Sequence, residues 1–408
     1  MRVRVGAAVL LVALAVVAPS ASARPDAPAA VPGVTATTIL LGGTLPLSGP
    51  AAAFASIGPG AEAYFKYVNA RGGVNRRKIL YRYVDDGYEP ARTVQATREL
   101  VQQDGVFAIF NSFGTENSIA ARPFLNQLKI PHLFLGTGVS DIGNGYRQYP
   151  WSMGYVPSFV GEGAIYGRNI ARTRPGAKVA VLFENSPYGR DLLAGLKRGL
   201  AGKARIVRAE HHEPTDVDVN SQMATLKASG ADTFMIFTTP QYTIQAYIAL
   251  TKLDWHPRVY VTSPSVEPTI MSIATLSAGK RATNESIAMA YLKDPTNPRW
   301  AKDKGVLLYR QIMRRYAPGR KANDIYHFYG MTVAHTMVTA LRQAGRNLTR
   351  QSLLRAATHL NEKDNPFVLP GVVIQTSPTS YYPITKAQLY RYRDGRWQPF
   401  SGLLGARG

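Results

Sequence analysis

The sequence predicts an α/β fold made of two units, each with an open and mainly parallel sheet. Three observations support this class. From residue 38 onward, short apolar runs alternate with amphipathic helical runs, which is the pattern of parallel strands joined by crossover helices. The pattern stops near residues 145–156 and then starts again, so we expect two units. The chain has 408 residues, 45% of them apolar, and is therefore long enough to bury two cores.

The first unit contains four predicted strands, which are residues 39–45, 79–84, 106–110 and 133–135. A helix follows the first strand, because apolar residues recur there at helical spacing. These residues are Ile57, Ala61, Tyr64, Phe65 and Val68. Gly72 and Gly73 end this helix, and Pro90 begins the next one. Thr115 is placed to cap a third helix that runs toward Leu128.

The second unit repeats the alternation. Its predicted strands are residues 178–183, a short run near Ile206, 233–237 and 259–262. A leucine stripe predicts the helix after the first of them, with Leu192, Leu193, Leu196 and Leu200 on one face. Two further helices are predicted from Met223 with Leu226 and from Ile244 with Ile248.

The pattern becomes mixed beyond Ser286. A strand at 287–291 is followed by long helices at 301–316 and 326–344, and by a late strand at 388–392. Residues 403–408 are expected to be frayed. We expect the chain to cross between two Rossmann-like lobes more than once, with hinge points near residues 154–157 and near Ser286.

These boundaries divide the chain into two lobes and three terminal segments. The predicted parts are a signal peptide (1–23), a flexible leader (24–36), a first lobe (37–152 with about 286–372), a second lobe (153–285 with about 373–400) and a tail (401–408). Several crossing strands would then form the hinge between the lobes.

Residues 1–23 have the features of a cleavable signal peptide. Arg2 and Arg4 supply positive charge, residues 5–18 form an apolar stretch of about 14 residues, and Ala21-Ser22-Ala23 fits small-x-small cleavage. The stretch is too short to cross a bilayer of ~30 Å as a helix; an uncleaved anchor is the alternative. The sequence has no cysteine to carry an N-terminal lipid. We therefore expect an exported protein, in the periplasm or at the exterior of the cell envelope, that is not a lipoprotein.

The chain is strongly basic, with 48 lysines and arginines against 26 acidic residues and a net charge of +22. Such a charge first suggests nucleic-acid binding. The basic residues are spread along the chain, however, no run reaches five consecutive like charges, and no RNA-binding aromatic signature accompanies them. The charge therefore favours a solvated basic surface, and we expect no nucleic-acid partner.

Signatures of the common catalytic classes are missing from the sequence. Neither the phosphate-binding Gly-x-x-x-x-Gly-Lys-Ser/Thr nor the nucleophile elbow Gly-x-Ser-x-Gly occurs. Gly136-Thr137-Gly138 begins like a dinucleotide-binding loop, but Asp141 stands where the third glycine is needed. The lack of cysteine excludes thiol catalysis and cysteine-ligated zinc. We therefore expect neither an enzyme nor a cofactor.

Two polar clusters could be interpreted as chemical sites. His211-His212-Glu213 could be part of a metal site, but the histidines are adjacent and Pro214 breaks any helix that would present them together. We expect a solvated loop there and no metal. Asp85-Asp86 could be a catalytic pair of carboxylates, but it ends a predicted strand and is expected to cap or orient the following turn.

The remaining candidates are loops at the carboxyl ends of strands, where ligands bind in open α/β sheets. They are residues 46–56, 111–117 and 136–140 in the first unit, and 185–188, 238–242 and 263–267 in the second. Hydroxyl groups, glycines and aromatic rings are frequent in them. Hydroxyls and free N–H groups suit a carboxylate, and aromatic rings suit an apolar body. Six such loops predict a ligand site in a cleft between the units.

Several motifs in order carry a family resemblance. They are Gly43-Thr44-Leu45-Pro46-Leu47-Ser48-Gly49-Pro50, Asn69-Ala70-Arg71-Gly72-Gly73-Val74, Asp85-Asp86 with Pro90, Asn185-Ser186-Pro187-Tyr188-Gly189-Arg190 and Ser229-Gly230-Ala231-Asp232. Together they resemble the branched-chain amino-acid-binding protein family over roughly residues 37–395. Members of that family are extracytoplasmic solute-binding components of ABC importers with the type I periplasmic binding-protein fold.

The resemblance implies where a ligand would bind. In the family, a first-lobe hydroxyl and the backbone of the next loop hold the ligand carboxylate; these features fall on Thr115 and on Gly136 with Gly138. Two aromatic contacts fall on Phe54 and Tyr188. The full predicted set is Phe54, Thr115, Gly136, Thr137, Gly138, Tyr188, Thr239, Tyr242 and Ser263.

The chain departs from the family at the position that binds the ligand's ammonium group. The family's acidic residue falls near Ser263, where this chain has Thr262-Ser263-Pro264-Ser265. A buried ammonium without a carboxylate partner is costly. Glu116, Glu184 or Glu267 could substitute, but none stands at the family position. We therefore favour a small carboxylate with an apolar or aromatic body as ligand, and an amino acid stays open.

The combined observations predict a monomeric binding protein that closes over a small solute and delivers it to an ABC permease in the membrane. Two alternatives remain. One is a sensory module of the same fold that signals to a receptor, which neighbouring permease and ATPase genes would argue against. The other is an exported α/β enzyme, which would hydrolyse members of an ester panel, although only seven histidines are available to it.

Overall fold

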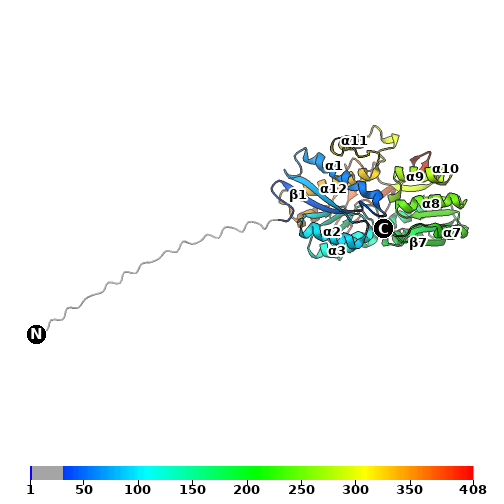
Figure 1. Cartoon of the computed structure of the whole chain (residues 1–408), viewed down its shortest axis with the longest axis horizontal. Coiled ribbons are helices and arrows are strands. Elements are labelled where there is room, and N and C mark those ends of the chain that lie inside the picture. The colour runs from blue at the N-terminus through cyan, green and yellow to red at the C-terminus, as the bar shows by residue number, and fades with distance from the viewer. Residues whose placement is uncertain (2–30, 408) are drawn as a thin grey trace. The chain divides into compact units, whose positions relative to one another are not determined.

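The computed structural model describes residue 1 and residues 31–407 of the chain. Apart from residue 1, the predicted signal peptide and the predicted leader up to residue 30 lie outside the described residues. Within the described ranges, no helix is both long enough and apolar enough to cross a membrane. Residues from Val31 onward form one unit, in which two α/β lobes lie side by side (Figure 1).

The first lobe is built on a sheet of five strands in the order β2-β1-β3-β4-β5, and every neighbouring pair is parallel. The strands are β1 (Thr38–Leu45), β2 (Lys78–Asp85), β3 (Ala108–Phe110), β4 (His132–Leu135) and β5 (Ser152–Gly154). β3 and β4 are buried along their whole length. Continuous burial explains why these strands are continuous apolar runs rather than alternating ones.

Helices from two separate parts of the sequence cover the first lobe. They are α1 (Ile57–Asn69), α2 (Pro90–Gln102), α3 (Thr115–Gln127), the short α4 (Ser140–Gly143), α11 (Lys304–Tyr316), α12 (Ile325–Ala344) and α13 (Arg350–Ala357). α1 packs against α12, and α2 packs against α3. The cap of α3 is Gly114 rather than the predicted Thr115, which is the first residue of the helix.

The second lobe contains a sheet of seven strands in the order β14-β13-β10-β9-β8-β6-β7. The strands are β6 (Lys178–Glu184), β7 (Arg205–His212), β8 (Thr233–Phe237), β9 (Arg258–Val261), β10 (Ile287–Ala290), β13 (Lys386–Arg393) and β14 (Arg396–Gly405). Five of them are parallel, while β13 is antiparallel to both β10 and β14. The sheet is therefore mixed at one edge, because β13 and β14 form a hairpin.

The second lobe has six α-helices among the described residues. They are α5 (Phe159–Thr173), α6 (Pro187–Leu200), α7 (Asn220–Ala228), α8 (Pro240–Lys252), α9 (Pro268–Ala278) and α10 (Lys280–Thr283). α5 and α6 approach each other closely through glycines. A Cβ atom at Gly163 would lie 2.1 Å from the carbonyl oxygen of Leu192, so only glycine fits there.

The chain crosses between the lobes after β5, after β10 and before β13. The prediction that the first lobe resumes at about residue 286 is wrong, because β10 pairs with β9 and β13 in the second sheet. The crossing lies after Ala290 instead. The small sheet of β11 (Asn361–Glu362) and β12 (Ile374–Gln375) precedes the last crossing.

The predicted frayed tail is also wrong. Residues 401–405 belong to β14, in which Gly405 pairs with Lys386 of β13. Ala406 is fully buried, and its N–H donates to the carbonyl oxygen of Thr385. The C-terminal segment thus completes the second sheet.

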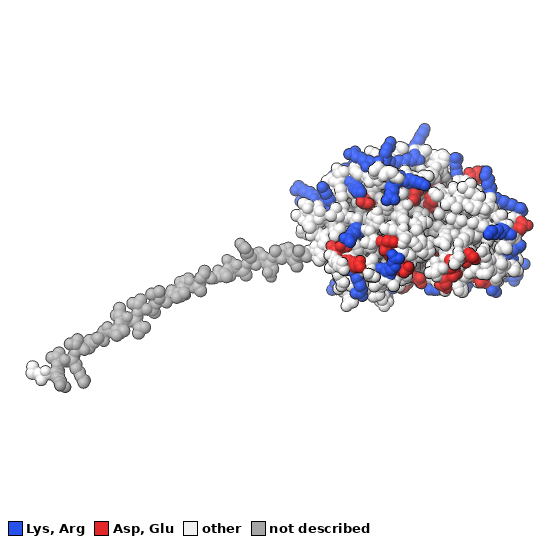
Figure 2. Space-filling view, viewed as in Figure 1, with Lys and Arg blue, Asp and Glu red and all other residues white. Residues whose placement is uncertain are grey.

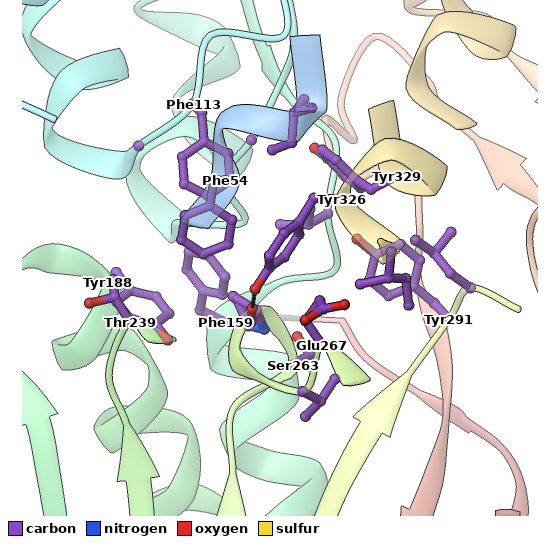
Figure 3. Close-up of a pocket in the computed structure, with 18 of the residues that line it drawn as sticks. Phe54, Phe113, Phe159, Tyr188, Thr239, Ser263, Glu267, Tyr291, Tyr326 and Tyr329 are labelled. Atoms are coloured by element: carbon purple, nitrogen blue, oxygen red, sulfur yellow. Dashed lines mark hydrogen bonds between the residues drawn. The ribbon is translucent and has the colours of Figure 1, made fainter. Parts of the chain in front are cut away.

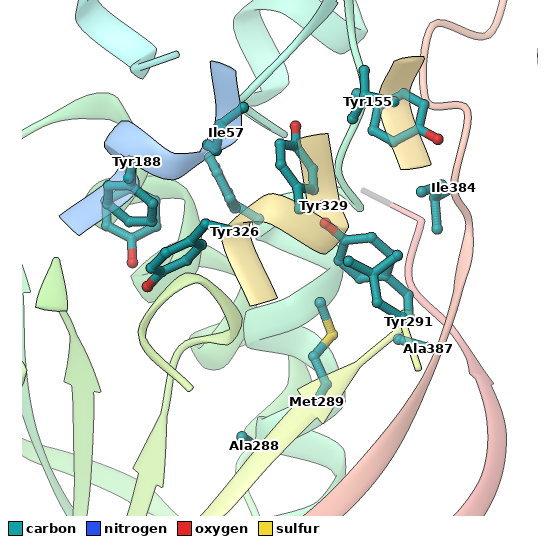
Figure 4. Close-up of a cluster of buried hydrophobic side chains, with 14 of the residues drawn as sticks. Ile57, Tyr155, Tyr188, Ala288, Met289, Tyr291, Tyr326, Tyr329, Ile384 and Ala387 are labelled. Carbon is teal, nitrogen blue, oxygen red and sulfur yellow. The ribbon is translucent and has the colours of Figure 1, made fainter. Parts of the chain in front are cut away.

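The hydrophobic core continues through the region where the lobes meet. Buried side chains from the first lobe, the crossing segments and the second sheet lie together there (Figure 4). Tyr155 anchors the first crossing, because its hydroxyl bonds to that of Thr336 on α12 at 2.9 Å. α12 is itself tied down by Glu362, which accepts the Thr336 hydroxyl at 2.6 Å and lies 2.6 Å from His335.

Charged side chains lie over both lobes. On the face seen in Figure 2, lysines and arginines are interspersed with acidic residues and are densest around α11. α11 contributes Lys304, Arg310, Arg314 and Arg315.

Candidate ligand-binding site

A cavity lies between the two lobes at the carboxyl ends of their strands. Its walls come from the segments that follow β1, β2, β3 and β4 in the first lobe and β6, β8, β9 and β10 in the second. The volume of the cavity is about 110 Å³. The two sheets therefore direct their carboxyl edges at one shared space (Figure 3).

Aromatic rings form most of the cavity wall. The ring of Phe54 lies 4.2 Å from that of Phe113 and 4.7 Å from that of Tyr326, measured between centroids. In the second lobe, Phe159 meets Tyr188 edge to face at 4.8 Å. Further aromatic side chains at the wall are Tyr88, Tyr291 and Tyr329. Such a surface favours a ligand with an apolar or aromatic body.

The turn after β2 holds Tyr88 against the cavity. Its φ is 65°, which is rare for a bulky residue. Asp86 fixes this conformation, because it accepts the Tyr88 N–H at 3.0 Å and the Thr93 hydroxyl at 2.8 Å. Asp85 accepts the N–H of Ser48 at 3.1 Å and thereby joins the turn to the first loop. The two aspartates orient the turn, as predicted.

The N-terminus of α3 supplies polar groups to the first-lobe wall. Gly114 has a φ of 108°, and a Cβ there would lie 2.5 Å from the side-chain oxygen of Asn117, so glycine is required. Thr115 lines the cavity, and its hydroxyl bonds to that of Thr137 at 2.7 Å. Gly136 lines it too and packs against the Phe113 ring. A helix N-terminus carries partial positive charge and free N–H groups, which suit an anion.

The second lobe contributes Tyr188, Thr239 and Ser263 to the wall. The hydroxyl of Tyr188 donates to the Thr262 hydroxyl at 3.1 Å. The hydroxyl of Ser263 donates to Glu162 at 2.8 Å, and the Ser263 N–H donates to the same carboxylate at 2.6 Å. Burial raises the pKa of Glu162, whereas these bonds oppose that shift. The polar atoms of Tyr188 and Ser263 are thus engaged within the protein.

Three residues of the predicted set do not reach the cavity surface. Thr137 is fully buried behind Thr115. Gly138 faces the first crossing, since a Cβ there would lie 2.0 Å from the Pro157 carbonyl oxygen. Contrary to the prediction, Tyr242 points away: its hydroxyl donates to the carbonyl oxygens of Pro214 and Asp216 at 2.7 and 2.8 Å.

The three candidate glutamates have different positions. Glu116 is partly exposed and does not line the cavity. Glu184 is buried at the end of β6 and does not line it either; burial raises its pKa to about 7. Glu267 lines the cavity and is 3% exposed, and burial raises its pKa to about 7. Glu267 is the one acidic side chain among the described residues at the cavity wall.

The predicted solvated loop at His211-His212 is wrong. Both histidines end β7, where the strand pairs with β6. His212 is buried, its ring centroid lies 3.9 Å from that of Tyr242, and burial lowers its pKa. Across residues 31–407, no group of three or more potential ligand side chains could hold a metal ion.

The sequence prediction missed most of the aromatic wall. Tyr326 and Tyr329 are on the first turns of α12, and Tyr291 follows β10 at the second crossing. These residues lie outside the six loops in which the sequence analysis placed the ligand site. A signal was present, because the spacing of Tyr326 and Tyr329 puts both rings on one face of a helix.

Two contacts join the lobes beside the cavity. Asp191 on α6 accepts the N–H of Ser140 on α4 at 2.6 Å and its hydroxyl at 2.9 Å. The hydroxyl of Tyr326 donates to the carbonyl oxygen of Pro264 at 2.8 Å. These bonds exist only while the lobes are together, so the structure represents a closed arrangement.

Two α/β lobes, three crossings and a cavity at facing strand edges define a bilobal binding protein. The chain belongs to the periplasmic binding protein family, whose family model matches residues 38–396. The predicted family resemblance and the predicted fold, the type I periplasmic binding-protein fold, are thus confirmed.

Individual proteins agree with this assignment. The Leu/Ile/Val-binding protein homolog 7 of Brucella abortus (strain 2308) is 27% identical over 233 residues, which is 54% of this chain and 55% of that protein. The chain thus spans about half the length of the curated relatives it matches. A branched-chain amino acid ABC transporter protein from Thermus thermophilus with bound valine has a TM-score of 0.78, with 18% identity over 90% of this chain and 96% of that one. A fatty acid ABC transporter substrate-binding protein from Thermomonospora curvata has a TM-score of 0.76, with 19% identity over 92% and 94% of the two chains. At 18% and 19% identity, the last two likenesses show a shared fold.

Proposed function

We propose that the protein is an exported solute-binding protein that captures a small carboxylate with an apolar or aromatic body and delivers it to an ABC importer permease. The observation that carries this proposal is the cavity between the lobes, with aromatic walls from both lobes and a helix N-terminus at one side. Family membership and the signal-like residues 1–23 support the transport role and the export.

The carboxylate is inferred from the donors at the first-lobe wall. The backbone at Gly114, Thr115 and Gly136 lies at the cavity, and α3 begins there. No lysine or arginine lines the cavity among the described residues. Helix-terminal N–H groups and a hydroxyl are therefore the groups that would hold an anion.

Closure would couple ligand binding to delivery. A ligand in this cavity touches both lobes only when they are together, so it stabilises the closed form by its difference in affinity for the two forms. The crossings after β5, after β10 and before β13 are the segments about which the lobes would hinge. The closed form would then present both lobes to the permease.

The test is a thermal-shift and calorimetric screen of the purified protein with small acids: valine, leucine, phenylalanine, benzoate, 3-phenylpropanoate and hexanoate. We expect at least one of them to raise the melting temperature and to bind. Thr115→Ala should weaken that binding about 3- to 10-fold, because one hydroxyl donor contributes about 1 kcal/mol. Thr225→Ala, on α7, serves as the matched control.

Two results would contradict the proposal. One is the absence of any melting-temperature shift at millimolar concentration across the whole panel. The other is recovery of a bound compound in a chemically altered form, which would indicate an enzyme.

A further inference from the structure

The segment between β9 and α9 contains four polar side chains, and among them only Glu267 has a buried polar atom without a hydrogen-bond partner in the described structure. The Thr262 hydroxyl donates to Glu162 at 3.3 Å. The Ser263 hydroxyl donates to Glu162 at 2.8 Å, and the Ser265 hydroxyl donates to the carbonyl oxygen of Thr238 at 2.7 Å. One carboxylate oxygen of Glu267, Oε2, accepts the N–H of Ile270 at 2.9 Å. The other, Oε1, is buried and has no hydrogen-bond partner among the described residues. An unpaired acceptor on a buried carboxyl group is costly unless something donates to it.

Within residues 31–407, no side chain donates a hydrogen bond of normal geometry to Oε1. The hydroxyl of Tyr326 is committed to the Pro264 carbonyl oxygen at 2.8 Å. Thr269 is near enough to lower the pKa of Glu267 but donates no hydrogen bond of normal geometry to Oε1. No basic residue lines the cavity among the described residues, and Asp324 raises the pKa of Glu267 further. Because Glu267 lines the cavity, a molecule bound there can supply a donor to Oε1.

The carboxyl group of Glu267 lies at the cavity, below the rings of Tyr326 and Tyr291 in the view of Figure 3. Val266, Met289 and Leu292 add apolar side chains to the wall of the same cavity. A donor in such a place is held strongly, since no bulk water competes for the acceptor.

We propose that Oε1 of Glu267 accepts a hydrogen bond from an O–H or N–H group of the bound solute, so that the protein selects apolar or aromatic acids that carry a second, donating group. This inference rests on the proposed function and adds a selection rule to it. Both a hydroxyl group and an ammonium group can donate this hydrogen bond.

The test uses three probes with one carbon skeleton: 3-phenylpropanoate, 3-(4-hydroxyphenyl)propanoate and phenylalanine. The first has no second donor, the second carries a phenolic hydroxyl, and the third carries an ammonium group. Dissociation constants are measured by calorimetry for the wild type, for Glu267→Met and for the control Glu62→Gln on the surface of α1. We expect at least one donor-bearing probe to bind the wild type about 10- to 100-fold more tightly than 3-phenylpropanoate, as for a hydrogen bond to a charged group.

Glu267→Met should bring this ratio to about 1, because methionine fills a similar volume without an acceptor. The ratio is taken within each variant, so any loss of stability from the missing α9 cap cancels. If the methionine variant does not fold, Glu267→Gln keeps the cap and should reduce the preference for phenylalanine. The probe that the wild type binds more tightly shows whether a hydroxyl group or an ammonium group is the preferred donor to Oε1.

Equal affinity of the wild type for all three probes overturns this inference and leaves the proposed function intact. A preference that survives in Glu267→Met also overturns it. Failure of all three probes, together with failure of the acid panel above, overturns the proposed ligand class and this inference with it.

Discussion

Asp191 joins the two lobes and can be altered without touching the cavity, which it does not line. Asp191 accepts two hydrogen bonds from Ser140 across the cleft, one from its N–H at 2.6 Å and one from its hydroxyl at 2.9 Å. Asp191→Asn preserves the size of the side chain but leaves one oxygen as acceptor and turns an NH₂ group toward the second donor. A hydrogen bond to a charged group contributes about 1.5–3 kcal/mol. Asp191 is only partly buried, so we take the lower end, about 1.5 kcal/mol.

A loss of about 1.5 kcal/mol shifts the ratio of closed to open molecules about tenfold toward the open form. The sequence has no cysteine, so cysteines introduced at the exposed Ala91 on α2 and Ala224 on α7 can be labelled without background. Single-molecule energy transfer between the labels should report longer distances in Asp191→Asn without any ligand. Asp254→Asn, in an exposed turn, should leave the distribution unchanged. Identical distributions for the wild type and Asp191→Asn would refute the reasoning.

Three further outcomes follow from buried groups and close contacts. Burial raises the pKa of Glu184 from 4.5 to about 7, so the folded state loses about 3 kcal/mol as the pH rises from 4.5 past 7. Glu184→Gln should therefore unfold at higher urea than the wild type at pH 8 but not at pH 4.5, and an equal difference at both pH values would contradict this. Deleting residues 401–408 should lower the melting temperature by several degrees, because β14 loses three of its seven pairs with β13, whereas a frayed tail would make no difference. Gly163→Ala should cost about 1–3 kcal/mol in urea unfolding, since its Cβ would meet the Leu192 carbonyl oxygen at 2.1 Å, while Gly402→Ala, with open space around it, should cost little.

The alternation of strands and helices was sufficient to predict both lobes, because continuously buried parallel strands leave unbroken apolar runs in the sequence. Strand β14 could not be found in this way. Its segment contains Pro399 and Gly402 and is largely exposed on an edge strand, so it lacks both the apolar run and a strict alternation. The assignment of β10 to the first lobe failed for a related reason: the lobe to which a strand belongs depends on pairing with β9 and β13, which are distant in sequence.

The site was predictable where loops follow strands. Phe54, Thr115, Gly136, Tyr188, Thr239 and Ser263 line the cavity because parallel strands bring such loops to one edge. Tyr242 also belongs to such a loop region, but it begins a helix whose rotation turns the ring toward Pro214 and Asp216. Tyr326 lines the cavity from a helix of the first lobe, and no local pattern relates that helix to the second lobe.

A crystal structure of the protein with the tightest-binding acid from the probe panel tests the central idea most directly. We predict density for the intact acid inside the cavity, with its carboxylate at the start of α3 and its ring among Phe54, Tyr188 and Tyr326. Density for the acid only on the outer surface of a lobe, or a closed cavity filled by side chains alone, would contradict the account.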